Sequence, residues 1–436
     1  MANEILDTNR ITSVQGGILA LCFFCMMLDG FDILIISFTA PAISEELAIA
    51  PEQLGLVFSA ALLGMAVGAM SLASLADVYG RRLVISGALL LSGVATLAVY
   101  YLDTVTQLMA LRFIAGLGLG TIVAVIPGFG GEYSPLKNRS VILSILVAGV
   151  AIGSVIGGVI SAWAIPLFGW RSLYLCGGLV ITFTAILFFL VVPESIQYLL
   201  VRKRHVALDR INRTLRYIRQ PSIAQLPPSD SRATESATVK SLLTPARRKT
   251  TLLAWLAFFM AFAGTYFMNS WLPKLLVEAG MSSQASIQAV VILNFGAITG
   301  TIGVGLLSRW RPLKILIVAS FMIATALMLL LSLIVRQAGD DIVGVVWALS
   351  FVIGITLHGA FGNIYTVVLS LYPAHIRITG LGWCVGLGRG GAIISPAVTG
   401  LLLGLGMSSA NMLGLFAIIA GMGAVFLGLM NTEEMA

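Results

Sequence analysis

The chain has 436 residues, of which 58% are hydrophobic and only 10% are charged, and its formal net charge is +7. Soluble domains carry about 25% charged residues, so this composition excludes a soluble globular protein. Apolar runs of about 20 residues recur along the whole chain, and each is long enough to cross a hydrocarbon core of about 30 Å as a helix. The sequence therefore predicts an all-α polytopic membrane protein.

Twelve hydrophobic segments follow one another along the chain. We place them at 17–42, 52–76, 82–102, 105–130, 140–166, 171–193, 250–277, 286–308, 311–335, 342–369, 378–404 and 409–430. One long polar break separates the sixth segment from the seventh. Its first half predicts a basic amphipathic helix, and the stretch PPSDSRATES predicts a flexible linker. We expect a six-helix bundle at 1–193, a cytoplasmic linker at 194–249 and a second six-helix bundle at 250–436.

Basic residues fall mainly in alternate loops. If both termini are cytoplasmic, most of the 26 lysines and arginines lie on the cytoplasmic side, and the central break holds the largest group. The positive-inside rule therefore predicts cytoplasmic N- and C-termini, with the protein in the cell inner membrane. The net charge reflects topology, so nucleic acid is not an expected partner. The N-terminal MANEILDTNR lacks a basic stretch and a cleavage site, so we expect no signal peptide.

The two halves share a faint internal repeat. EYSPLKNRS after the fourth segment and LYPAHIRIT after the tenth both contain Pro-x-x-x-Arg, and LADVYGRRLV has a degenerate counterpart in LLSRWRPLKI. Matches at equivalent positions of a six-plus-six layout indicate a two-fold transporter architecture with its substrate site between the halves, near the bilayer midplane.

Several motifs now resemble one known group of transporters. ASLADVYGRRL and RFIAGLGLG resemble the loop 2–3 and segment-four motifs of the major facilitator superfamily, with Ala73 in place of the usual leading glycine. Within the superfamily, DGFD, EYSP, PES, NSWLPKLLVEAG and YPAHIRITGLGWCVGLGRGGAIISP resemble the aromatic acid:proton symporters. This resemblance covers nearly the whole chain. It implies import of a small aromatic or related ring-cleavage carboxylic acid together with protons, by alternating access.

Two aspartates stand inside the first segment, in MMLDGFDILII. Asp29 and Asp32 are spaced i and i+3, so they share one helix face. A charge at bilayer depth is costly, and burial and mutual repulsion both favour a protonated, neutral carboxyl group. We therefore expect the pair to take part in proton coupling; a structural pair neutralised by an arginine is the alternative.

Arg112 lies within the fourth segment and is the expected counter-charge. We predict a contact between Arg112 and an aspartate of the first segment whose strength depends on protonation. A static salt bridge is the alternative. Glu132, at the cytoplasmic end of the same segment, joins the proton-coupling candidates, although its place favours a gating network with the loop arginines.

We expect a set of charged loop residues to form a gate on the cytoplasmic side. The motif resemblance assigns Asp77, Arg81 and Arg82 to a charge relay between the two halves; plain positive-inside anchoring is the alternative. Arg139 and Arg377, one in each copy of the repeat, are further gate candidates.

Arg389 lies deep in the eleventh segment, among four glycines. A guanidinium recognises a planar carboxylate with two parallel hydrogen bonds, so Arg389 is the first candidate for binding the substrate anion. A role in helix packing stays open. GLGRGG is not a nucleotide loop, because no Gly-Lys-Ser/Thr follows it.

A flat aromatic acid also needs an apolar slot with a few hydrogen-bonding groups. Candidates for stacking are Phe31, Tyr266, Trp271, Phe361 and Trp383. Candidates for hydrogen bonds to ring hydroxyls are Asn269, Asn294, Asn363 and His358.

We expect no enzymatic chemistry, because the sequence offers no nucleophile–base pair, metal cluster or phosphate loop. Cys22 and Cys25 have the spacing of half a metal or redox site, but without a second pair we interpret them as small core residues. We expect no cofactor besides the coupling proton, and a functional monomer. Alternatives are a proton-coupled efflux antiporter, a sugar-type porter and a transporter-like receptor that binds without net transport.

Overall fold

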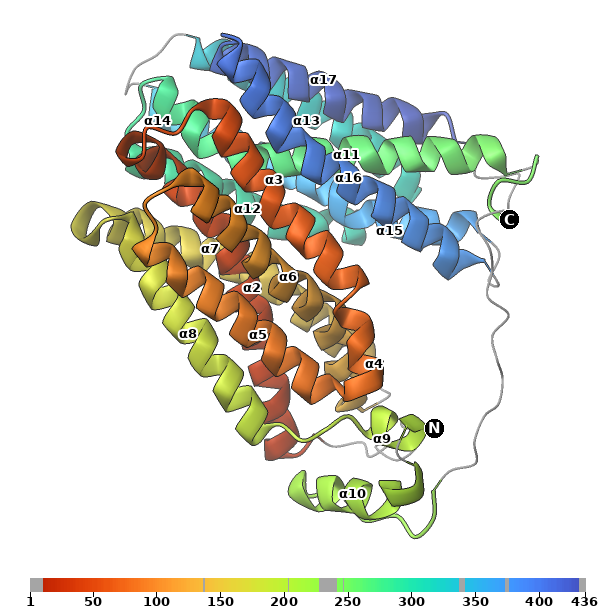
Figure 1. Ribbon diagram of the computed structural model, residues 1–436. Helices are drawn as coiled ribbons and strands as arrows, with labels where there is room; N and C mark the ends of the chain where they lie inside the picture. Colours follow the sequence, from red (N-terminus) through yellow and green to blue (C-terminus); the bar gives the residue numbers. More distant parts are fainter. Residues whose placement is uncertain are drawn as a thin grey trace. The chain divides into compact units, whose positions relative to one another are not determined.

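The computed structural model describes residues 11–135, 138–202, 204–226, 241–245, 247–336, 342–372 and 376–430. Helices account for nearly all of these residues, and no strand occurs among them (Figure 1). The all-α fold expected from composition is thus confirmed.

Twelve helical stretches in the described residues are long and apolar enough to cross a membrane. In the first half they are α2 (Ser13–Glu46), α3 (Pro51–Met70) continued by η1 (Ala73–Leu75) and α4 (Ala76–Tyr79), α5 (Arg81–Ala98), α6 (Val105–Glu132), α7 (Arg139–Phe168) and α8 (Trp170–Val191). In the second half they are α11 (Arg248–Glu278), α12 (Ser283–Leu307), α13 (Leu313–Val335), α14 (Val343–Ile353) continued by η6 (Gly354–His358) and α15 (Gly359–Leu371), α16 (Arg377–Gly404) and α17 (Ser409–Gly428). The twelve predicted segments are confirmed.

The largest difference from the predicted bounds is in the first helix. We expected 17–42, whereas α2 runs from Ser13 to Glu46. Polar residues such as Gln15 and Glu45 lie at its ends, where the helix continues about one turn beyond the apolar run. Hydropathy detects the apolar part of a helix and not its hydrogen-bonded ends, so this kind of error is expected.

The described chain forms two compact units. The first comprises Met1–Ile33, Leu63–Gly157 and Arg171–Ala233, and the second comprises Leu34–Leu62, Gly158–Trp170 and Thr234–Ala436. The division passes through α2, α3 and α7, so each of these helices contributes to both units. The domain bounds predicted from the sequence stay a prediction.

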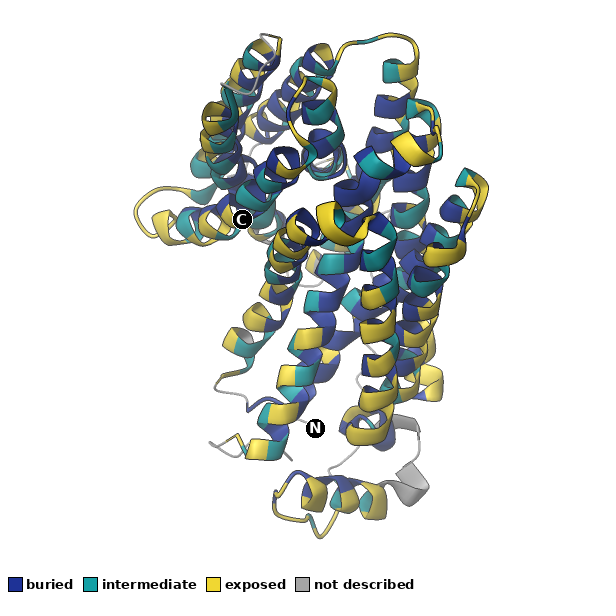
Figure 2. Cartoon of the chain, turned by 90° about the vertical axis from the view of Figure 1, so that its left-hand side faces the viewer, coloured by how far each residue is buried: buried dark blue, intermediate teal, exposed yellow. Residues whose placement is uncertain are grey.

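In the first unit, α9 (Ile196–Arg202) and α10 (Arg204–Tyr217) follow the sixth spanning helix. Ile211, Leu215 and Ile218 are fully buried, whereas Arg213 and Arg216 are exposed, and Figure 2 shows this alternation of buried and exposed residues. The basic amphipathic helix predicted for the central break is therefore present. The stretch PPSDSRATES lies outside the described residues.

Close approach of α2 and α7 depends on glycine. A Cβ atom on Gly30 would overlap the backbone carbonyl of Val150, and one on Gly153 would overlap the carbonyl of Met27. Ser154 donates a 2.8 Å hydrogen bond from its hydroxyl to the Gly30 carbonyl oxygen. The glycine between the two aspartates thus lets another helix reach the backbone of α2, as small residues do in membrane bundles.

The second unit is built around α11, which packs against α16 and α17, while α13 packs along α17 (Figure 1). Phe267 of α11 and Phe416 of α17 stack with their ring centroids 3.9 Å apart. Between α14 and α15, Gly354–His358 forms a π-helical turn. Single π turns are rare and are often found at functional sites.

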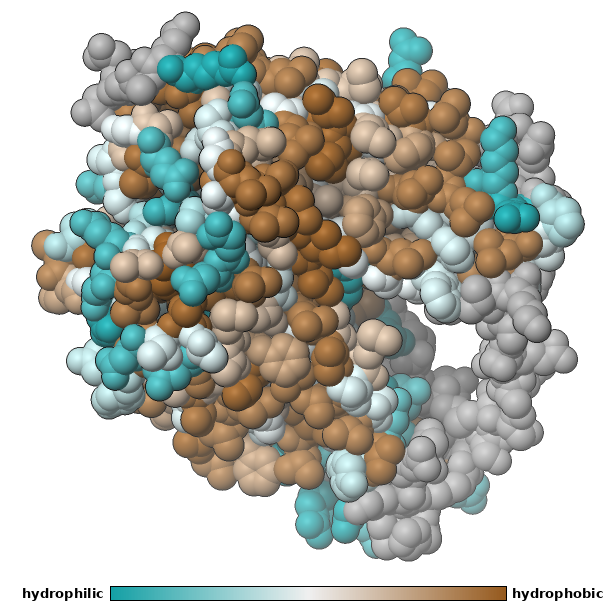
Figure 3. Space-filling model, turned by 45° about the horizontal axis from the view of Figure 1, so that its top comes forward, coloured by the Kyte–Doolittle hydropathy of each residue, from teal (hydrophilic) through white to brown (hydrophobic). Residues whose placement is uncertain are grey.

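Large hydrophobic side chains cover much of the surface. Phe183 is 65% exposed, Leu190 71% and Trp310 74%. Figure 3 shows hydrophobic side chains over broad areas of the face it draws. Soluble monomers rarely expose continuous apolar areas of this kind, so this surface is consistent with contact with lipid.

Candidate functional site

Asp32 and Arg112 form a buried ion pair in the first unit. The Arg112 Nη1 atom lies 3.3 Å from Asp32 Oδ2, and both side chains are buried, with 1% or less of their surface exposed. Arg112 also donates to the Asp32 backbone carbonyl at 3.3 Å and to Oδ1 at 3.4 Å. The predicted contact between Arg112 and an aspartate of the first segment is therefore present, and its part in proton coupling stays a prediction.

Thr96 of α5 bridges the two charged groups. Its hydroxyl donates to Asp32 Oδ1 at 2.7 Å and accepts from Arg112 Nη2 at 2.9 Å. The Arg112 guanidinium also lies 5.5 Å from the centre of the Tyr174 ring. Sequence reasoning missed both residues, because a threonine or a tyrosine in an apolar span is usually a packing residue and only the fold brings these two to the pair.

Asp29 is buried in α2, one turn before Asp32, with 1% of its surface exposed. Gly30 between the two aspartates lies directly against the Val150 backbone of α7. The first segment thus places two carboxyl groups inside the bundle, and one of them, Asp32, forms an ion pair with Arg112.

Glu132 takes part in a different network of the first unit. Its carboxylate forms an ion pair with Arg81 and accepts a 2.5 Å hydrogen bond from the Ser195 hydroxyl. Arg81 also lies 3.9 Å from the exposed carboxylate of Asp77. These contacts join Glu132 to Arg81 and, through it, to Asp77; its role in proton coupling or in gating stays a prediction.

The Glu194 carboxylate accepts hydrogen bonds from the backbone at the start of α5. Its Oε1 atom accepts backbone hydrogen bonds from Arg81 at 2.9 Å, Arg82 at 3.1 Å and Ser195 at 2.8 Å. The preceding residue, Gly80, has φ +106°, and a Cβ atom there would overlap the Glu194 carboxylate. The glycine of the DVYGRR motif is therefore required both by its backbone conformation and by this carboxylate.

Tyr133 connects the same region to the end of α6. Its hydroxyl donates to the backbone carbonyls of Pro193 and Glu194 at 3.2 and 3.1 Å. Burial raises the pKa of Tyr133 well above its ordinary value, so the hydroxyl keeps the proton that these bonds need. Sequence reasoning missed Tyr133 and Glu194, although the EYSP and PES motifs contain them.

The remaining gating candidates, Arg82, Arg139 and Arg377, each have contacts of their own. Arg82 donates to the Phe189 carbonyl and lies over the Phe189 ring, 4.5 Å from its centre. Arg139 lies against Gly131 of α6. In the second unit, exposed Arg377 donates to the Tyr372 carbonyl at 3.1 Å.

Three predicted hydrogen-bonding residues meet in the second unit. Asn269 Nδ2 lies 3.3 Å from His358 Nε2, and Asn294 donates to Asn269 Oδ1 at 3.4 Å. His358 belongs to the π-helical turn, and its Nδ1 atom is buried without a hydrogen-bond partner among the described residues. We call these three residues the amide–histidine group. Asn363 lies apart from them and donates to the Thr301 and Gly359 carbonyls.

Aromatic rings line one side of α11 and α15. Phe262 stacks on Tyr266, with 6.0 Å between centroids and 3° between planes, and meets Phe361 edge-on at 4.8 Å. Tyr365 lies edge-on to Phe258 at 5.4 Å and to Phe361 at 5.9 Å. We call these five rings (Phe258, Phe262, Tyr266, Phe361, Tyr365) the aromatic cluster. It contains two of the rings predicted for stacking.

Arg389 of α16 is partly buried and interacts electrostatically with Tyr365 of the aromatic cluster. Its neighbour Gly388 lies directly against the ring of Phe262. Arg389 forms no ion pair with any residue that the structure describes. This arginine therefore keeps its charge available next to a group of aromatic rings.

Three predicted stacking residues lie outside the aromatic cluster. Trp271 is fully buried, meets Phe58 edge-on at 5.3 Å and donates to the Pro396 carbonyl. Trp383 is 41% exposed, with its ring tilted against Trp255 at 5.8 Å. Phe31, in the first unit, packs against glycines of α7 and α8.

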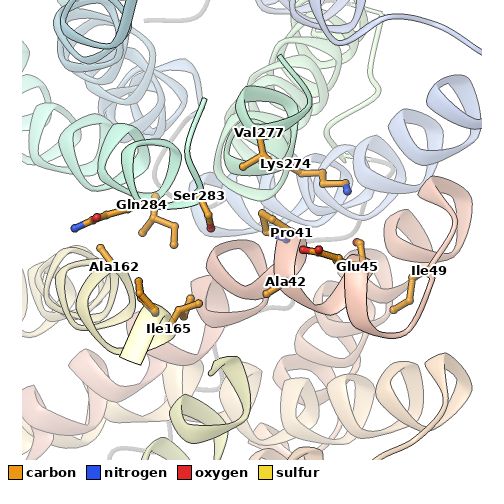
Figure 4. Close-up of a pocket in the computed structure, with 13 residues that line it drawn as sticks. Pro41, Ala42, Glu45, Ile49, Ala162, Ile165, Lys274, Val277, Ser283 and Gln284 are labelled. Carbon is orange, nitrogen blue, oxygen red and sulfur yellow. The ribbon is translucent and has the colours of Figure 1, made fainter. Parts of the chain in front are cut away.

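A cavity of about 470 Å³ in the second unit contains none of the predicted substrate residues. Its wall includes Ser44 and Glu45 of α2, Lys274 of α11 and Gln284 of α12. Figure 4 shows the Glu45, Lys274 and Gln284 side chains coming from different helices. Lys274 already lies 3.8 Å from Glu278, and Glu45 adds a second carboxylate. The balance of charge does not favour an organic anion here.

Comparison with known proteins places the chain in a family. The sequence model of the Major Facilitator Superfamily matches residues 22–396. The chain is 33% identical to the 4-hydroxybenzoate transporter PcaK of Pseudomonas aeruginosa, covering 92% of this chain and 89% of that protein. It is 30% identical to a gallate transporter of Pseudomonas putida, covering 92% and 88%.

Solved structures agree on the fold. The crystal structure of a D-xylose-proton symporter superposes with a TM-score of 0.74, covering 97% of this chain and 99% of that one, at 16% identity. At that identity the likeness concerns the fold alone. These relatives are transporters and not enzymes, as the sequence predicted. The chain therefore belongs to the major facilitator superfamily, as a multi-pass membrane transporter of the aromatic acid:proton symporter family.

Proposed function

We propose that this transporter imports a small aromatic carboxylic acid together with protons, by alternating access. The observation that supports coupling most strongly is the Asp32–Arg112 pair, a carboxylate and a guanidinium that are both buried in apolar spans. Breaking such a pair by removing one charge is costly, because the other charge stays buried and unpaired. If Asp32 took up a proton, Arg112 would lose its buried negative partner, and the free energy of the helix arrangement around the pair would change by a large amount.

A proton helps an organic anion to enter a cell. Moving one negative charge into a cell that is negative inside costs about 2.3 kcal/mol per 100 mV. A proton moving with the anion cancels this charge movement, and a pH gradient with the inside more alkaline then drives accumulation. Coupling requires that the protein reorients only with acid and proton both bound or both absent.

For the substrate we propose the region around Arg389. The guanidinium has no ion-pair partner among the described residues, and it lies beside the aromatic cluster. Carboxylate binding by arginine and stacking on aromatic rings together suit a flat benzoate-like anion. The amide–histidine group offers donors and acceptors for ring hydroxyls, such as those of 4-hydroxybenzoate and gallate.

The remaining parts of the proposal concern the topology, the location, the coupling ion, the oligomeric state and the gate. The positive-inside pattern supports cytoplasmic termini and an inner-membrane location. The proton is proposed to be the coupling ion, with no further cofactor, and the functional unit is proposed to be a monomer. Glu132 with Arg81, Asp77 and Ser195 is proposed to act as a cytoplasmic gate, because it joins the DVYGRR loop to the end of α6 and to the turn before α9.

Uptake by purified protein in liposomes tests this function. We expect radiolabelled 4-hydroxybenzoate or gallate to accumulate when the outside is made acidic, and the accumulated acid to leave when an uncoupler is added. Acid export driven by an inward proton gradient would instead identify an efflux antiporter. Accumulation that ignores the proton gradient would contradict coupling.

A further inference from the structure

A hollow of the first unit, about 410 Å³ in volume, lies between the end of α8, the start of α5 and α10. It is lined by Arg82, Leu190, Val191, Val192, Pro193, Glu194, Leu199, Arg210, Arg213, Thr214 and Tyr217. None of its residues belongs to the aromatic cluster, the amide–histidine group or the Asp32–Arg112 pair. The transport mechanism proposed above gives this hollow no task.

The charge in this hollow is strongly positive. Three of its lining residues are arginines, and Arg210 and Arg213 form no ion pair with a residue that the structure describes. The one carboxylate in its wall, Glu194, already accepts three backbone hydrogen bonds at the start of α5 and before α9. Asp209, the neighbouring carboxylate on α10, is exposed. An anion with several acceptor oxygens fits this arrangement.

One rim of the hollow is apolar and continues onto a membrane-spanning surface. Leu190 is 71% exposed and Val191 42%, and about two turns back along α8 Phe183 is 65% exposed. The Tyr217 side chain is 47% exposed, and its hydroxyl donates to the Val191 carbonyl at 2.9 Å, which fastens the end of α10 to the end of α8. Tyrosine in this role is typical of the boundary between membrane and water.

We propose that this hollow binds the phosphate of an anionic phospholipid headgroup, with the acyl chains lying along the exposed apolar face of α8. A free phosphate would use the arginines alone and leave the apolar rim unused, whereas a lipid uses both. Arginine pairs with phosphate oxygens through two parallel hydrogen bonds, and basic pockets at the cytoplasmic ends of spanning helices attract anionic lipids. The lipid would hold α10 at the membrane surface, next to the turn before α9 in which Glu194 accepts a backbone hydrogen bond from Ser195.

The experiment uses the full chain in detergent. Binding of phosphatidylglycerol, phosphatidylcholine and inorganic phosphate is compared by native mass spectrometry and by the shift of the thermal unfolding midpoint. The test variant is Arg210→Gln with Arg213→Gln. The control is Arg216→Gln with Arg219→Gln, because these two arginines are exposed on the same stretch and lie outside the hollow. Both variants lose the same charge.

We expect wild-type protein to bind phosphatidylglycerol in preference to phosphatidylcholine, and the test variant to bind it roughly 10- to 30-fold more weakly. The control should stay within about threefold of wild type, because diffuse surface charge contributes little at a distance. Arg210→Lys with Arg213→Lys, which keeps the charge, should give an intermediate affinity and guards against misfolding of the test variant. Equal weakening in test and control variants would overturn the proposal, as would inorganic phosphate that displaces the lipid at comparable concentration.

Discussion

Arg112 and Arg389 are both arginines inside apolar helices, but their surroundings differ. Arg112 is 1% exposed and meets the Asp32 carboxylate, the Asp32 backbone carbonyl and the Thr96 hydroxyl. Arg389 is partly buried, lies beside aromatic rings and has no ion-pair partner in the described part of the chain. A charge that the protein already neutralises suits an internal switch, whereas a charge without a protein partner suits binding of an anion from outside. The two arginines thus support two different tasks.

The largest effect is expected at the neutralised pair. Asp32→Asn removes the negative charge and leaves Arg112 buried without it, and breaking a buried pair in this way costs about 3–5 kcal/mol. We expect accumulation of the acid in liposomes to be lost. Asp77→Asn is the control, because the Asp77 carboxylate is 74% exposed and lies 3.9 Å from its arginine; it should slow turnover without abolishing accumulation. Full accumulation by both Asp29→Asn and Asp32→Asn would remove the basis for the switch.

A smaller effect is expected at the arginine without a partner. Arg389→Gln should weaken binding of the acid by roughly 100-fold, since losing one side of a buried charge pair costs about 2–5 kcal/mol. Arg389→Lys should restore part of the affinity. Arg336→Gln, an exposed arginine that bonds Asn411, serves as the control and should bind normally. Isothermal titration with 4-hydroxybenzoate measures all three, and unchanged affinity in Arg389→Gln would assign Arg389 to helix packing.

The bridge inside the pair offers a finer test. Thr96→Val removes a hydroxyl that donates to the Asp32 carboxylate at 2.7 Å and accepts from Arg112 at 2.9 Å. Without it both charged groups lose a hydrogen bond inside the bundle, so proton-driven accumulation of the acid should fall. A hydrogen bond to a charged group contributes about 1.5–3 kcal/mol, so a loss of roughly tenfold or more in accumulation is expected. Thr121→Val, which removes a buried hydroxyl bonded to backbone carbonyls, is the matched control.

The smallest effect should depend on the substrate. Asn269→Ala removes the centre of the amide–histidine group, and a lost hydrogen bond to a ring hydroxyl costs about 1 kcal/mol. We expect affinity for 4-hydroxybenzoate to fall by roughly fivefold, while affinity for benzoate changes little. Asn363→Ala is the comparison, because Asn363 bonds backbone carbonyls away from this group. Equal losses for both acids would place the hydroxyl contact elsewhere.

Much of the fold could be predicted from the sequence, because the requirement for long apolar helices leaves a simple pattern. Twelve spans and the amphipathic α10 were recognisable from composition and periodicity. The extra turns of α2 were not, because polar residues at helix ends resemble loop residues. The π-helical turn at Gly354–His358 has no sequence pattern of its own and arises from packing.

Residues of the candidate site could be predicted when burying them in the membrane costs free energy. Asp32 and Arg112 stood out because a buried charge requires a partner, and that partner was found. A threonine such as Thr96 costs little free energy in any membrane span, so nothing in the sequence connected it to the Asp32–Arg112 pair. Trp271 is a different case: an aromatic residue in an apolar span can stack on substrate or pack in the core, and its fully buried ring packs edge-on against Phe58, so its substrate role stays a prediction.

Proton movement in the Asp32→Asn variant tests the central claim most directly. Liposomes with a pH-sensitive dye inside can be followed in two assays, net acid uptake and exchange of labelled for unlabelled acid. For the wild type we expect acid uptake to acidify the interior. For Asp32→Asn we expect exchange to persist while acid uptake and the dye response are both lost. Acid-dependent acidification of wild-type size in Asp32→Asn would contradict the assignment of the coupling proton to this carboxylate.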